Sequence, residues 1–96
     1  MPTKPKKPDR VGARAGDHIA FIPIMGSFAV GILEAGDPKK LAKLDEGRQF
    51  FVLEFLRTPE NCRHFARSAI AFAGLRINPE EHKLERGFSY ELVEQE

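Results

Sequence analysis

Residues 18–34 contain two apolar segments separated by Gly26 and Ser27. Both segments are rich in Ile, Val and Phe, and two such segments around a short Gly-containing loop are typical of a β-hairpin. A two-residue loop at this point pairs Met25 with Phe28, and the alternation of side chains along each strand then sorts the hairpin into two faces. The bulkier face, which we assign to the core, carries Ile19, Phe21, Pro23, Met25, Phe28, Val30 and Ile32.

The other face of the predicted hairpin is also apolar, but many of its side chains are small. Ala and Gly leave a flat surface that a partner protein or a second copy of the chain can approach closely. The residues we expect to contact a partner on this face are Ala20, Ile22, Ala29 and Gly31. The alternative is that the last helix and the C-terminal strand of the same chain cover this face.

Three later segments begin with a small polar residue followed by Pro and end at Gly, at residues 37–47, 58–74 and 78–87. Asp, Thr and Asn suit the N-cap of a helix, Pro suits its first position, and Gly accepts the left-handed conformation at its end. The pattern predicts three helices. The middle one is long, with an apolar stripe at helical spacing, whereas residues 79–86 form either a short helix or a turn.

Two further segments alternate as strands do. In the segment RQFFVLEFL, at residues 48–56, large apolar side chains occupy both odd and even positions. This favours a central strand with most of both faces buried. GFSYELVEQ, at residues 87–95, alternates Phe, Tyr and Leu with Ser89 and Glu91. This indicates a half-buried strand with one face in water.

The order of these elements, ββαβαβ, predicts an α+β domain over residues 15–96. We expect a mostly antiparallel sheet of about four strands, with one long helix packed on it and one or two short helices. A rolled, barrel-like sheet is the variant that the pattern leaves open. The chain has 96 residues, 42% of them hydrophobic and eight of them Phe, which suits a single core.

Charge sets the N-terminal segment apart. Residues 1–14 hold five basic residues and one acidic residue, a net charge of +4, which leaves −3 for the rest of a chain whose total is +1. This segment contains several Pro residues and lacks large apolar side chains that could pack against the domain, so we expect a disordered basic arm. Such an arm can bind phosphate backbones. The residues of this nucleic-acid hypothesis are Lys4, Lys6, Lys7, Arg10, Arg14 and Arg76.

The sequence favours a cytoplasmic protein that does not enter a membrane. No apolar run is long enough to span a bilayer, and the first residues do not resemble a secretory signal. A single cysteine, Cys62, excludes a disulfide within the chain and fits a reducing compartment.

Candidate catalytic and metal-binding groups are sparse. Cys62 falls on the apolar stripe of the middle helix and His64 on its outer face, so the two are poorly placed as nucleophile and base. The three His residues lack metal-ligand spacing, and the glycines match no nucleotide fingerprint. We therefore expect no catalytic residue, no metal and no cofactor. A small-molecule enzyme built around His64 or Glu54 is the least favoured hypothesis.

Arg63 and Arg67 are four residues apart on the middle helix. A basic helix face of this kind can bind carboxylates or phosphates, and Arg is the residue best suited to both. We assign these two residues to partner binding, with a solvated charged face as the alternative.

The hairpin also carries a family resemblance. The spacing Gly16-Asp17-x-x-Ala20-x-x-Pro23, followed by Gly26-x-Phe28-Ala29-x-Gly31, resembles the opening strand pair of the immunity protein 26 family of bacterial polymorphic toxin systems. It covers residues 16–34 only. The resemblance implies a bacterial, non-enzymatic protein that neutralises a toxin by binding it. Our leading hypothesis is accordingly a protein-interaction module, such as an inhibitor or immunity-like accessory protein, with nucleic-acid binding as the alternative.

Overall fold

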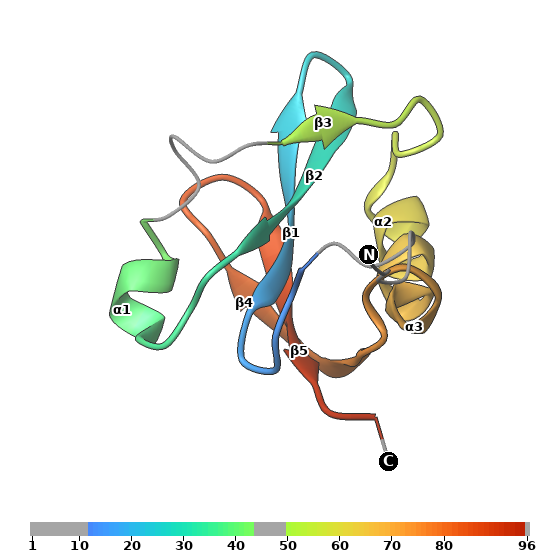
Figure 1. Ribbon diagram of the computed structural model, residues 1–96. Coiled ribbons are helices and arrows are strands. Elements are labelled where there is room, and N and C mark those ends of the chain that lie inside the picture. Colours follow the sequence, from blue (N-terminus) through green and yellow to red (C-terminus); the bar gives the residue numbers. More distant parts are fainter. Residues whose placement is uncertain (1–11, 44–49, 96) are drawn as a thin grey trace, which may run out of the picture.

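The computed structural model describes residues 12–43 and 50–95 (Figure 1). Five strands form one antiparallel sheet in the order β3-β2-β1-β5-β4. The strands are β1 (His18–Ile24), β2 (Ser27–Leu33), β3 (Phe51–Val52), β4 (Arg76–Lys83) and β5 (Phe88–Val93), and the helices are α1 (Pro38–Leu41), α2 (Pro59–Arg67) and α3 (Ala69–Ala73).

The α+β class and the antiparallel sheet are confirmed, with three corrections. The sheet has five strands rather than about four, it is open with β3 and β4 at its edges, and the described residues contain short helices in place of a long one. Residues 1–11 of the basic arm predicted at 1–14, and the end of the helix predicted at 37–47, lie outside the described residues.

The predicted hairpin is present as β1 and β2, with a different register. Phe28 pairs with Pro23 rather than with Met25, so the two loop residues are Met25 and Gly26. Both have positive φ, 47° and 84° respectively. This is the conformation of a type I′ turn, whose twist matches that of the flanking strands. Because the register shifts by two positions, each face of the hairpin keeps its predicted members except Met25, which moves from the predicted core face into the turn.

Helices α1 and α2 begin at the cap residues that the sequence predicts. The Thr58 hydroxyl accepts a hydrogen bond from the Asn61 amide at 3.1 Å, and the Asp37 carboxylate accepts one from the Lys39 amide at 3.0 Å. Pro occupies the first helical position after each of these caps. The caps satisfy amide groups that have no partner within the first helical turn.

The predicted helix at 58–74 is two helices, α2 and α3, because Ser68 interrupts it. The Ser68 hydroxyl donates to the Phe65 carbonyl oxygen at 2.6 Å, a local bond that competes with regular helix geometry. At the end of α3, Gly74 adopts a φ of 75°, as the terminal glycine predicts.

The helix predicted at 79–86 is wrong, because most of this segment belongs to β4, and the turn alternative holds only locally, at its start. The Asn78 side chain accepts a hydrogen bond from the Glu80 amide at 3.0 Å, an Asx turn rather than a helix cap. Pairing with β5 is irregular between Ile77 and Glu81, which brackets Pro79. An irregular edge strand tolerates Pro because it needs no donor on its outer side.

The central strand predicted at 48–56 is also wrong within the described residues. Only Phe51 and Val52 pair, with Val30 and Ala29 of β2, and β3 lies at the edge of the sheet. By contrast β5 is an inner strand, between β1 and β4. Its predicted wet face is wrong at Ser89, which is fully buried.

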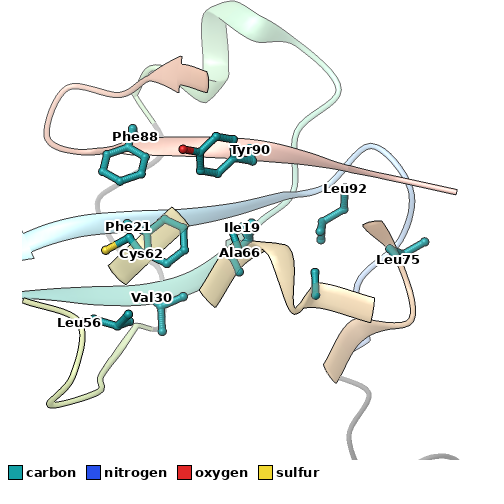
Figure 2. Close-up of a cluster of buried hydrophobic side chains, with 11 residues drawn as sticks. Ile19, Phe21, Val30, Leu56, Cys62, Ala66, Leu75, Phe88, Tyr90 and Leu92 are labelled. Carbon is teal, nitrogen blue, oxygen red and sulfur yellow. The ribbon is translucent and has the colours of Figure 1, made fainter. Parts of the chain in front are cut away.

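The two faces of the sheet bury separate clusters. Helices α2 and α3 cover one face, which we term the α2–α3 face (Figure 2). Its buried members are Ile19, Phe21, Val30, Leu56, Cys62, Ala66, Ala69, Leu75, Phe88, Tyr90 and Leu92. The other, which we term the α1 face, buries Ala20, Ile22, Leu33, Leu41 and Leu84, with Ala35 and Phe50 packed against them.

Candidate functional site

Five large apolar side chains are exposed on the turn between β1 and β2, on β3 and on the segment after β3. Figure 1 shows the course of these segments in the fold. This set, termed the tip patch, consists of Ile24, Met25, Phe51, Val52 and Phe55, with exposed fractions between 45% and 99%. The Phe28 amide donates to the Leu56 carbonyl oxygen at 2.7 Å, which holds the segment after β3 against the hairpin. Among the described residues, Ile70 on α3 is the other exposed large apolar side chain.

Sequence reasoning missed the tip patch for identifiable reasons. The predicted register placed Met25 on the core face, whereas it is a turn residue and 99% exposed. The apolar run at 48–56 suggested burial on both faces, whereas β3 is a two-residue edge strand. A Met-Gly pair at the centre of a hairpin was the available signal, because Gly favours the positive φ of a type I′ turn.

The flat hairpin face predicted to bind a partner is covered within the chain. The structure brings Ala20, Ile22, Ala29 and Gly31 together on the α1 face, where all four are buried. Leu41 of α1 and Leu84, between β4 and β5, pack over this face. The cover thus comes from α1 and from Leu84, which lies in the segment that the alternative prediction named, although that segment is not a helix. A partner reaches these four residues only if that cover moves.

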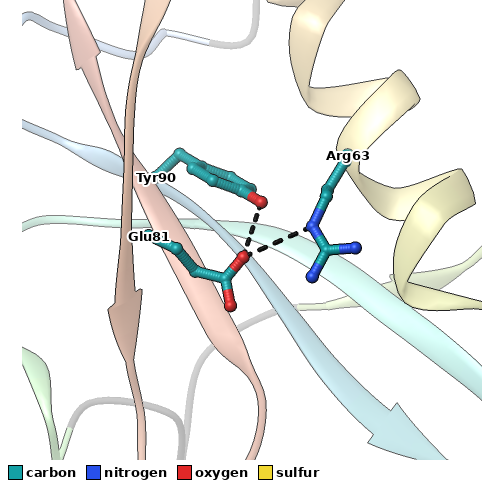
Figure 3. Close-up of polar contacts among 3 residues, drawn as sticks. All are labelled: Arg63, Glu81 and Tyr90. Atoms are coloured by element: carbon teal, nitrogen blue, oxygen red, sulfur yellow. Dashed lines mark hydrogen bonds and ion pairs between the residues drawn. The ribbon is translucent and has the colours of Figure 1, made fainter.

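Arg63 lies beside a tyrosine and a glutamate rather than standing free (Figure 3). The Tyr90 hydroxyl donates to the Glu81 carboxylate oxygen Oε1 at 2.8 Å, and Arg63 Nε lies 3.5 Å from the same oxygen. Burial, together with the hydrogen bond to Glu81, raises the pKa of Tyr90. Arg67 joins these three side chains at the wall of a small open cavity of about 160 Å³. The carboxylate already present there competes with any acidic ligand for Arg63.

The remaining basic residues of the nucleic-acid hypothesis do not form one described patch. Lys4, Lys6, Lys7 and Arg10 lie outside the described residues. Arg14 is exposed and lines a depression with Asp17 and Glu34, and it is not part of the wall that Arg63 and Arg67 share. Arg76 is exposed at the start of β4 and is not part of the wall that Arg63 and Arg67 share.

A buried polar pair on the α1 face was not predicted. His18 Nδ1 lies 2.8 Å from the Ser89 hydroxyl, and the His18 and His82 rings meet edge to face at 4.9 Å. Burial, with the neighbouring His82, lowers the pKa of His18 to about 4. The distance suits a nucleophile and its base, but Ser89 is 0% exposed and His18 only 5%. His18 begins a predicted strand whose residues are apolar on both faces. This position was the signal that its side chain would be buried.

Cys62 and His64 lie as the helical stripe predicts. Cys62 is fully buried on the α2–α3 face, and burial raises the pKa of its thiol to about 11. His64 is exposed on the outer side of α2. A thiol of this kind behaves as a small hydrophobic side chain rather than as a nucleophile.

Within residues 12–43 and 50–95, no helix is both long and apolar enough to cross a membrane, and no three His, Cys, Asp or Glu side chains are grouped so as to hold a metal ion. No protein-family model matches the chain, and no curated protein or solved structure is significantly similar to it.

Proposed function

We propose that this chain is a small non-enzymatic protein-interaction module that binds a partner protein through the tip patch. The observation that carries the proposal is the exposure of five large apolar side chains at one end of the sheet. Contiguous exposed apolar surface is uncommon on soluble proteins and marks interaction sites. Phe and Met are also enriched in protein interfaces. Arg63 and Arg67, on α2, are a second and more polar region for contact.

A finer form of the proposal is an inhibitor or immunity-like accessory protein. It draws on the resemblance of residues 16–34 to the immunity protein 26 family. Within that segment the turn at Met25 and Gly26 is exposed, whereas Ala20 and Ala29 are buried. A toxin captured by this segment would therefore contact the turn first.

The burial of His18 and Ser89 supports the non-enzymatic part of the proposal. A nucleophile acts only where a substrate can reach it, and the Ser89 hydroxyl is enclosed by the sheet and the α1 face. The raised pKa of Cys62 also supports a non-enzymatic role, because it lowers the population of the thiolate, which is the reactive form.

Affinity capture with matched variants tests this function. The whole chain is used as bait in lysate of the native host, with and without nuclease treatment, as wild type, as the double variant Met25→Asn with Phe55→Ser, and as Ile70→Ser. Asn tolerates the positive φ at Met25, and Ile70 is an exposed apolar residue outside the tip patch. We expect a protein retained by wild type and by Ile70→Ser to be lost with the double variant.

Retention of the same proteins by all three baits would contradict the proposal, since the tip patch would then be irrelevant to binding. Loss of all captured material on nuclease treatment would favour the nucleic-acid alternative. In that case removal of residues 1–10 should abolish capture, and binding should weaken steeply with salt.

A further inference from the structure

A cavity of about 160 Å³ is lined both by the sheet and by α1, which lies on the side of the sheet away from α2 and α3 (Figure 1). Pro38 and Leu41 of α1 border this cavity together with His18 of β1 and His82 of β4. Leu41 also packs against the apolar residues of the α1 face. The same short helix therefore covers the flat hairpin face and borders the two imidazole rings.

His18 is the buried titratable group at this cavity. Its Nδ1 lies 2.8 Å from the Ser89 hydroxyl, and its ring meets that of His82 edge to face. A neutral imidazole fits this enclosure, whereas an imidazolium adds a charge and a second N–H donor that require partners or water. Burial, together with the neighbouring His82, accordingly lowers the pKa of His18 to about 4. Closure of the cavity thus favours the neutral ring.

Carboxylates from three segments also face this cavity, and they reduce the cost of a charge on His18 without removing it. Asp17, which precedes β1, raises the pKa of His18, but burial and His82 outweigh it. Glu91 of β5 lies opposite His18 in the strand register, and Asp37 lines the cavity at the start of α1. The Asp37 carboxylate is already engaged as the helix cap. Protonation of His18 therefore remains unfavourable while the cavity is closed.

Of the helices and strands that line the cavity, α1 is the shortest, with four residues. A helix of this length is not stable by itself. Its attachments include the packing of Leu41 and a hydrogen bond from the Glu85 amide to the Ala42 carbonyl oxygen at 3.2 Å. Strands β1, β4 and β5 are instead joined to one another by the sheet. Helix α1 is therefore the element that can move while the sheet stays intact.

We propose that α1 is an acid-sensitive cover, which protonation of His18 displaces from the sheet so that the flat hairpin face is exposed. In the displaced state water reaches the imidazolium, and the penalty for its charge is relieved. Ala20 and Ile22, both buried when the cover is closed, become accessible. This inference goes beyond the proposed function and does not rest on the tip patch.

Amide hydrogen exchange of the whole purified chain, followed by NMR between about pH 7.5 and about pH 5, tests the cover. Each rate is divided into the intrinsic rate at the same pH, which gives a protection factor. The Glu85 amide reports on α1, because its acceptor is the Ala42 carbonyl oxygen, and the Phe28 amide, bonded to the Leu56 carbonyl oxygen, reports on the α2–α3 side. Wild type is compared with His18→Asn and with His64→Asn, a control at an exposed histidine on α2.

In wild type, the protection factor of the Glu85 amide should fall by about 25-fold from about pH 7.5 to about pH 5, because the displaced state restores the ordinary proton affinity of His18. At each pH it should lie at least about tenfold below that of the Phe28 amide, because α1 opens without the rest of the domain. His64→Asn should behave as wild type. His18→Asn should remove most of the fall at Glu85.

Three outcomes would overturn the inference. Equal protection of the Glu85 and Phe28 amides at every pH would show that both faces open together, by unfolding of the whole domain. The same fall at Glu85 in wild type and in His18→Asn would show that another group drives the displacement. A Glu85 amide without protection at neutral pH would show that α1 is displaced before His18 binds a proton.

Discussion

The α2–α3 face of the sheet is closed by aromatic rings from both sides, whereas the α1 face is closed by leucines on short segments. Phe21 contacts Phe88 at 5.4 Å and Phe65 at 6.4 Å between ring centroids. On the α1 face, Leu41 comes from a helix of four residues. Two faces of one hairpin, both apolar in sequence and both buried, are thus covered by different kinds of side chain. We expect interlocking aromatic rings to resist opening more than leucines carried by short segments do.

The largest effect is expected on the α2–α3 face. Phe21 is fully buried among aromatic rings, so Phe21→Ala leaves a cavity that the neighbouring strands β2 and β5 cannot close. We expect a loss of about 4 kcal/mol in the free energy of unfolding, measured by urea denaturation. The milder Phe21→Leu keeps the fold measurable if the Ala variant does not fold. A loss below about 1 kcal/mol for the Ala variant would show that this face is not the main core.

A smaller and more local effect is expected on the α1 face. Leu41→Ala should cost roughly 2 kcal/mol, because the four-residue helix α1 can move toward the sheet and reduce the cavity. Amide hydrogen exchange should rise around α1 while the inner strands stay protected. Lys40→Ala, an exposed neighbour on the same helix, is the control. Uniformly faster exchange throughout the sheet would show that both faces open together.

The pH dependence of stability should come in part from the α1 face. The pKa of His18 is about 4 in the folded chain and 6.5 as its ordinary value. The unfolded chain therefore binds the additional proton between these values, and stability falls as the pH drops through this window. From about pH 7.5 to about pH 5, the loss from His18 is roughly 2 kcal/mol.

The variant His18→Asn isolates this contribution. Asn places an amide near the position of Nδ1, where it can keep the hydrogen bond to Ser89, and it does not titrate in this range. Asp17, His82 and Glu91 surround the same site and remain in both proteins. The difference between the two urea series thus reports His18. Parallel pH profiles for wild type and His18→Asn would refute the assignment.

How far the sequence predicts this fold depends on how local each signal is. The caps at Asp37 and Thr58 and the end at Gly74 were predictable, because the residues that make each hydrogen bond are a few positions apart. The faces of the hairpin were predictable from side-chain alternation alone. Its register was not, because it depends on which two residues take positive φ.

The predictions for residues 78–87 and for β3 were wrong because these segments are determined by pairing between residues far apart in the sequence. The Asn78-Pro79 pair looks like a helix start, but the segment is held as a strand by its pairing with β5. Gly87 looks like a helix end, yet its φ is 93° and a Cβ there would lie 1.9 Å from the Phe21 carbonyl oxygen, so Gly is needed for close approach of the backbones. Neither the edge position of β3 nor the tip patch follows from composition, because exposure is decided by which strands are neighbours.

The single cysteine allows opening of the α2–α3 face to be measured without an added label or a further substitution. Cys62 is completely enclosed beneath α2, and burial raises its pKa to about 11. An aromatic disulfide reagent added to the native protein can therefore react with Cys62 only when α2 moves away from the sheet. The rate of colour development measures the rate or the extent of that local opening. Because the same thiol is present in every variant proposed above, one reagent can time the opening of this core in all of them.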